Sequence, residues 1–145
     1  MVLDEAERSI HDALCVLRCL VKNKGIVAGG GAIEIEIAKH LESFAQVQKG
    51  ILGKVVEKYA EALEVIPFIL ASNCGLNPIK IVTEMRSKHQ AGFKSCGLKA
   101  RTGHIVDNTL EHKIMQPSLV NISALTLATE VTRMILKIDD IIESR

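Results

Sequence analysis

The chain has 145 residues, enough for one domain with a hydrophobic core and short for two. Its residues are 48% apolar and only 3% aromatic, so any core is built from small and branched aliphatic side chains. The net charge of +1 comes from interspersed charges, with no basic stripe or aromatic platform, which argues against nucleic-acid binding. No segment is typical of a membrane span or a secretory signal, so a cytoplasmic protein is expected.

Apolar periodicity predicts a mainly α-helical chain, with helices over 4–24, 33–44, 51–72, 78–89 and from 117 onward. Residues 33–37 alternate like a strand, but the longer i, i+4 pattern through 44 favours a helix. The last helix carries an apolar stripe that continues to Ile141 and Ile142. A helix apolar around so much of its circumference is usually surrounded by protein, which indicates that part of the domain is missing.

Glycine and proline mark the boundaries between these helices. Pro67 lies inside the third helix and is expected to kink it or free a carbonyl. Gly75 is expected to stop that helix, and Asn77 with Pro78 to start the next, because Asn caps and Pro fits the first turn. The glycine-rich segment 92–106 is expected to be a loop or a small hairpin.

Three consecutive glycines, Gly29, Gly30 and Gly31, separate the first two predicted helices. A glycine loop that leads into a helix leaves bare N–H groups where an anion or a flat ligand can approach. The alternative is a sharp turn where two helices cross, and the pattern alone leaves both open. It is not a Walker A motif, because no Gly-Lys-Ser or Gly-Lys-Thr follows. Lys39 is one of three lysines flanking this turn that could favour a phosphate, although a lysine near a loop is more often simply solvated.

Asp12 is the next candidate, because it lies among apolar residues of the first predicted helix. A carboxylate near a phosphate can hold a metal or orient an attacking water. Spacing alone favours the alternative, a solvated helix residue or one that forms a salt bridge to Arg8. His11, Cys15 and Cys19 have the only metal-like spacing in the chain. A zinc site would need a fourth ligand, so a buried helix face is the favoured interpretation and no metal site is predicted.

The chain resembles the group II chaperonins, the family of the archaeal thermosome and the eukaryotic cytosolic chaperonin. The resemblance rests on a series of segments whose order and spacing agree along essentially the whole chain: 7–14, 28–32 with Glu34, 62–67, 74–79 and 135–142. The runs 12–21 and 123–130 are most similar to the delta branch of this family.

The resemblance implies a helical bundle in which 1–24 is the C-terminal part of the intermediate domain. Residues 25–145 would be the C-terminal half of the equatorial, ATP-binding domain. It also implies part of a subunit that hydrolyses ATP to fold cytosolic proteins inside a double-ring chamber. The expected partners are other chaperonin subunits of a hetero-oligomeric ring and unfolded clients such as actin and tubulin.

By the same resemblance, Gly29, Gly30 and Gly31 contact the nucleotide through their backbone, with Gly30 central, and Asp12 orients the attacking water. The other expected contacts are the base-side segment Leu98, Lys99 and Ala100, together with Gln116 and Asn121. Gln116 stands where the family usually has an acid that binds the ribose, and Asn121 stands where a lysine is common. These departures predict that the nucleotide affinity or the turnover of this subunit differs from that of its relatives.

The Gly-Asp-Gly-Thr-Thr stretch that cradles the phosphates in this family does not occur in the sequence. ATP or ADP would therefore bind with Mg²⁺ held mainly by the missing N-terminal half, and the chain is expected to be a piece of a longer subunit. The apolar faces it leaves uncovered predict self-association. The alternative hypothesis is a stand-alone helical interaction module that kept the fold and has no ATPase activity.

Overall fold

The computed structural model describes residues 2–140 and 142, and its helices and strands fall into two compact units. A central unit spans Val27–Gln116. The other unit is formed by the two ends of the chain, up to Ile26 and from Pro117 onward. The chain therefore enters and leaves the central unit at two short strands, β1 (Ile26–Ala28) and β4 (Met115–Pro117), which pair with each other.

The end unit contains two long helices, α1 (Val2–Lys22) and α5 (Ser118–Ile135), which contact each other. The backbone N–H of Ser118 donates a hydrogen bond to the carbonyl oxygen of Gly25 at 2.9 Å and so ties the two segments together. None of the described residues of α1 or α5 is buried, although both helices carry apolar stripes. These stripes are the faces that the sequence predicts to need cover from other protein.

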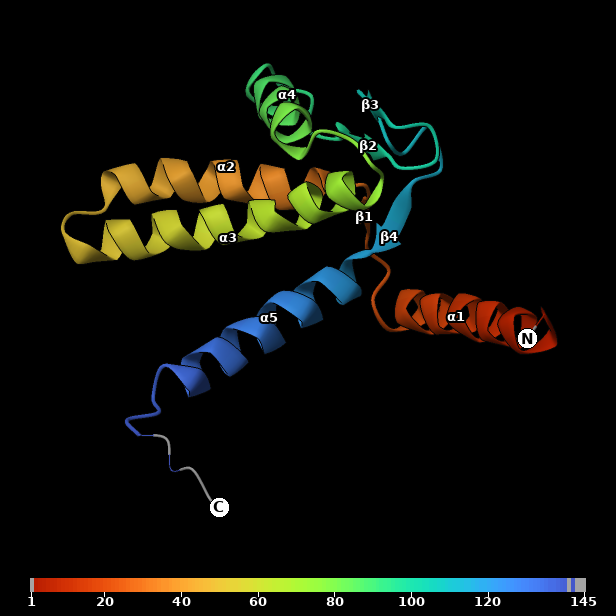
Figure 1. The fold of residues 1–145 in the computed structure, drawn as a ribbon, viewed down its shortest axis with the longest axis horizontal. Coiled ribbons are helices and arrows are strands. Elements are labelled where there is room, and N and C mark those ends of the chain that lie inside the picture. The colour runs from red at the N-terminus through yellow and green to blue at the C-terminus, as the bar shows by residue number, and fades with distance from the viewer. Residues whose placement is uncertain (1, 141, 143–145) are drawn as a thin grey trace. The chain divides into compact units, whose positions relative to one another are not determined.

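In the central unit, α2 (Ala32–Val47) and α3 (Ile51–Asn73) lie side by side and α4 (Pro78–Gln90) packs on both (Figure 1). Two short strands, β2 (Gly97–Lys99) and β3 (His104–Val106), follow as an antiparallel hairpin in which Leu98 lies opposite Ile105. The start of α4 is capped as predicted, since Asn77 Oδ1 accepts a hydrogen bond from the backbone N–H of Lys80 at 3.2 Å.

The hydrophobic core of the central unit joins all three helices to the hairpin. Half-buried apolar residues, Leu76 and Ile105 among them, pack against its edge. The buried members of the cluster are Ile35, Ala71, Ile81, Met85 and Leu98. Because Leu98 belongs to this core, β2 is held against the helices by side-chain burial as well as by hydrogen bonds.

The mainly α-helical fold is confirmed, and so is the hairpin within the predicted segment 92–106. Residues 33–37 are helical despite their alternation, because Ala32, Ile35 and Ala38 form a buried stripe at helical spacing. Pro67 is accommodated within α3, where it is buried. The short strand β1 was not predicted, and its three residues carry too little pattern to reveal it.

The predicted extent of the last helix is wrong. The α5 helix ends at Ile135, and beyond the capping Leu136 the backbone N–H groups reach back only three residues, from Lys137 to Met134 and from Ile138 to Ile135, both at 3.1 Å. Leu136 is 80% exposed and Ile138 is 61% exposed, so no burial of the stripe stabilises a longer helix. Ile141, part of the predicted stripe, lies outside the described residues.

Candidate functional site

The glycine turn, Gly29–Gly31, links β1 to α2 through a backbone conformation that side chains disfavour. Gly30 has a φ of 70° and Gly31 a φ of 80°, both in the left-handed region. Gly31 is the N-cap of α2 and has no side chain with which to cap the first N–H groups of the helix. The turn therefore ends at the positive end of a 16-residue helix.

Close backbone packing against β2 explains why the central residue of this turn is glycine. The N–H of Leu98 donates to the carbonyl oxygen of Gly30 at 2.9 Å. A Cβ atom on Gly30 would lie 2.5 Å from the carbonyl oxygen of Leu98, and one on Gly97 would lie 2.7 Å from the carbonyl oxygen of Gly29. The structure thus brings together two of the predicted segments, the glycine turn and the loop that begins at Leu98.

The predicted nucleotide-contacting residues of the central unit differ in their access to solvent. Gly29 and Gly31 are buried, whereas Gly30 is half-buried and offers the accessible backbone of the turn. Leu98 is 1% exposed, and its side chain belongs to the hydrophobic core. The accessible residues of the predicted segment 98–100 are therefore the half-buried Lys99 and the exposed Ala100. Gln116 is also half-buried and lies in β4. Two residues before it, the carbonyl oxygen of Ile114 accepts a hydrogen bond from the N–H of Gly29 at 3.1 Å.

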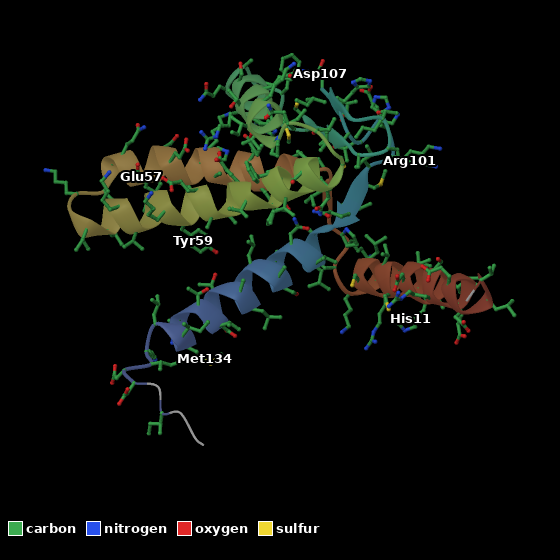
Figure 2. The ribbon with its side chains drawn as sticks, viewed as in Figure 1. His11, Glu57, Tyr59, Arg101, Asp107 and Met134 are labelled. Carbon is green, nitrogen blue, oxygen red and sulfur yellow. The ribbon has the colours of Figure 1, made fainter. Side chains whose placement is uncertain are left out.

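The two remaining predicted residues belong to the end unit. Asp12 lies on α1 with its side chain 74% exposed and its Oδ1 atom 3.8 Å from Nδ1 of His11, which projects from the same helix (Figure 2). Cys15 Sγ lies 3.8 Å from Nδ1 of His11. Asn121 is half-buried in the second turn of α5. No group of three or more metal-ligating side chains occurs among residues 2–140 and 142.

A buried polar network behind the glycine turn was missed by sequence reasoning. His89, which has no exposed surface, places Nδ1 2.7 Å from Glu36 Oε2 and Nε2 2.8 Å from the carbonyl oxygen of Cys96. Lys39, for which a phosphate contact and plain solvation were the two alternatives, donates from Nζ to the carbonyl oxygen of His89 at 2.7 Å. The partners lie 7 to 53 residues apart in sequence, so no local pattern marks them.

Electrostatics keep Glu36 ionised in this network. Burial raises the pKa of Glu36, but the hydrogen bond with His89 and the positive charges of Lys39, His89 and His40 outweigh it, so the net pKa is lowered. By contrast, burial raises the pKa of the Cys96 thiol to about 11, so this cysteine is an unreactive core residue.

A cleft between α2 and α3, near the loop that joins them, is lined by charged residues, most of which form ion pairs. Arg86 donates two hydrogen bonds to the buried carboxylate of Glu64. Along the exposed edge of α3, Lys54 pairs with Glu57 at 2.8 Å. Because most charges of this cleft are already engaged in ion pairs, the glycine turn and its surroundings remain the stronger candidate for a ligand site.

The profile of the TCP-1/cpn60 chaperonin family matches residues 1–145. The chain belongs to this family. Among residues 2–140 and 142, no helix combines the length and apolarity needed to cross a lipid bilayer.

Delta subunits are among the chaperonin relatives with similar sequences, as the resemblance predicts. The chain is 58% identical to "T-complex protein 1 subunit delta" of Arabidopsis thaliana and 54% identical to that of Homo sapiens. Both alignments cover 145 residues, which are 100% of this chain and 27% of each relative. The chain thus spans about a quarter of the length of these curated relatives.

A solved chaperonin structure has the same fold. It is described as the open-state monomer of a group II chaperonin from Methanococcoides burtonii. The TM-score is 0.83 at 41% sequence identity, over 94% of this chain and 34% of that one. This likeness confirms that the helices and the hairpin form a group II chaperonin fold.

Proposed function

We propose that this chain is part of an ATP-hydrolysing chaperonin subunit and forms the base side of its nucleotide pocket. The observation that carries the proposal is the 2.9 Å hydrogen bond from the N–H of Leu98 to the carbonyl oxygen of Gly30, which joins the glycine turn to the base-side segment 98–100. Gly30, Lys99 and Ala100 offer accessible groups next to that bond. A flat base fits such a surface, because glycine adds no side chain that would hold it away.

The charges near the turn favour the base and the ribose over the phosphates. Glu34 is buried in the first turn of α2, so an acidic group lies where an anion would otherwise benefit from the helix dipole. The amide of Gln116 can donate and accept hydrogen bonds with ribose hydroxyls without adding charge. The phosphates and Mg²⁺ would accordingly be held by residues of a longer subunit, outside this chain.

Asp12 would then supply the chemistry of turnover. Its exposed carboxylate can accept a hydrogen bond from a water and orient the oxygen toward the γ-phosphate. Asn121 would contact the nucleotide as a neutral side chain. In the whole protein, we propose that hydrolysis drives the folding of cytosolic clients, such as actin and tubulin, in a hetero-oligomeric double ring in the cytoplasm.

The test uses a chimera in which this chain replaces the matching 145 residues of the delta subunit of Saccharomyces cerevisiae, which is 53% identical to it. Asp12→Ala is compared with Glu7→Ala, an exposed acid on the same helix. ATP binding is measured by calorimetry with Mg²⁺, and hydrolysis by phosphate release from the assembled ring. We expect Asp12→Ala to bind ATP normally and to lose nearly all turnover, while Glu7→Ala keeps both.

Unchanged hydrolysis in Asp12→Ala would remove this residue from the mechanism. A wild-type chimera that assembles but neither binds nor hydrolyses ATP at this subunit would instead support the interaction-module alternative. For the 145-residue chain alone, we expect weak or undetectable ATP binding, because the phosphate-binding groups are not in it.

A further inference from the structure

The buried histidine of α4 connects three segments of the central unit. The ring of His89 hydrogen bonds to Glu36 on α2 through Nδ1 and to the carbonyl oxygen before β2, at Cys96, through Nε2. The backbone carbonyl of His89 accepts a third bond from Lys39 Nζ at 2.7 Å. One residue therefore holds the end of α4, the first half of α2 and the start of the hairpin together.

Both partners of the ring are hydrogen-bond acceptors. The Cys96 carbonyl carries no proton, and the lowered pKa of Glu36 keeps its carboxylate ionised. Each ring nitrogen of His89 therefore lies within hydrogen-bond distance of an acceptor on a different segment. A polar ring with no exposed surface is tolerated because both of its nitrogens have hydrogen-bond partners. The other titratable or charged groups that line its surroundings are Lys39, His40, Glu42, Glu64, Arg86 and the Cys96 thiol.

The network of Glu36, His89 and Cys96 reaches both segments that meet at the Leu98–Gly30 hydrogen bond. Cys96 precedes Leu98 by two residues, and Leu98 donates to Gly30. On the other side, Glu36 lies one helical turn beyond the start of α2, which follows directly from Gly31. A shift of His89 would therefore move the β2 strand relative to the glycine turn.

We propose that His89 is a positioning residue of the nucleotide pocket, which holds β2 against α2 so that Leu98 stays hydrogen bonded to Gly30. The ligand it serves is the base and ribose end of a nucleotide, so this inference rests on the proposed function. A core histidine that only stabilises the fold would weaken the whole central unit evenly. A positioning residue weakens the Gly30–Leu98 contact first.

Two substitutions separate the geometry of the network from its charge. His89→Gln keeps a polar side chain but has a single donor nitrogen, which cannot serve Glu36 and Cys96 in opposite directions. Glu36→Gln instead removes the carboxylate charge but keeps a partner for Nδ1 of His89, because an amide can both donate and accept, while Nε2 can still bond to Cys96. The matched control is His112→Gln, an exposed histidine outside the network.

The first measurement is amide hydrogen exchange on the 145-residue chain, which requires no nucleotide. We expect His89→Gln to speed exchange at Leu98 about tenfold or more, the loss typical of a hydrogen bond to a charged group. Exchange at Ala60, buried in α3, should stay unchanged, and Glu36→Gln and His112→Gln should both resemble wild type. Equal acceleration at Leu98 and Ala60, or none at Leu98, would overturn the inference.

The second measurement is ATP hydrolysis by the chimera described above. We expect His89→Gln to raise KM for ATP about tenfold while kcat changes by less than about twofold, because binding geometry and not the attacking water is disturbed. The single variant Glu36→Gln should have a KM for ATP close to that of wild type. An active chimera whose KM is insensitive to His89→Gln refutes the positioning role. A wild-type chimera without ATPase activity refutes the proposed function. In that case, amide hydrogen exchange at Leu98 alone decides whether His89 holds β2 against the glycine turn.

Discussion

Gly30→Ala tests whether the glycine turn is required by its approach to β2. The new Cβ atom would lie 2.5 Å from the carbonyl oxygen and 3.0 Å from the nitrogen of Leu98, distances at which the backbone must shift. The φ of 70° adds about 1–2 kcal/mol for a residue with a side chain. Overpacking typically costs a further ~1–3 kcal/mol, so we expect a total destabilisation of about 2–5 kcal/mol.

Gly75→Ala is the matched control, because Gly75 has a φ of 72° and a Cβ atom added there would meet no heavy atom within 4 Å. It should cost only the conformational term of about 1–2 kcal/mol. The entropy that alanine removes from the unfolded chain is the same at both sites and cancels in the comparison. The difference between the two variants therefore measures the contact with Leu98.

Urea unfolding followed by aromatic signals reports the central unit selectively. The chain has no Trp, and its single Tyr and three Phe residues all lie within Val27–Gln116. Tyr59, which projects from α3, gives the fluorescence signal (Figure 2). If Gly30→Ala is no more destabilising than Gly75→Ala, close packing of the turn on β2 is not what requires glycine.

Three further predictions concern the same unit. The Thr109 hydroxyl is fully buried and has no hydrogen-bond partner among the described residues. Thr109→Val should therefore raise the free energy of unfolding by about 1 kcal/mol, whereas Thr109→Ser, which keeps the hydroxyl, should bring no gain. Because the pKa of Glu36 is lowered from 4.5 on folding, its contribution is present above about pH 4.5 and lost as pH falls through the folded value. Urea midpoints should therefore fall more steeply in acid for wild type than for Glu36→Gln; parallel curves would contradict this. With a pKa of about 11 and a buried side chain, Cys96 should react with a thiol reagent at pH 8 at least about a hundredfold more slowly than the exposed Cys15, as mass spectrometry of the labelled chain would show.

Much of this fold is determined by local sequence. The helices α2, α3 and α4 follow from apolar periodicity, and the start of α4 follows from Asn77 and Pro78, because capping depends on neighbours within one turn. The glycine turn is also visible locally, since consecutive glycines permit the left-handed backbone found at Gly30 and Gly31.

Only the tertiary structure reveals what that turn contacts. The bond from Leu98 to Gly30 and the network of Glu36, His89 and Cys96 join residues far apart in the chain, and no periodic signal encodes such pairs. The same reason explains the end of α5 at Ile135. Its apolar stripe continues in the sequence beyond that residue. A helix extends only where burial of its apolar face stabilises it, and the described residues leave this stripe exposed to solvent.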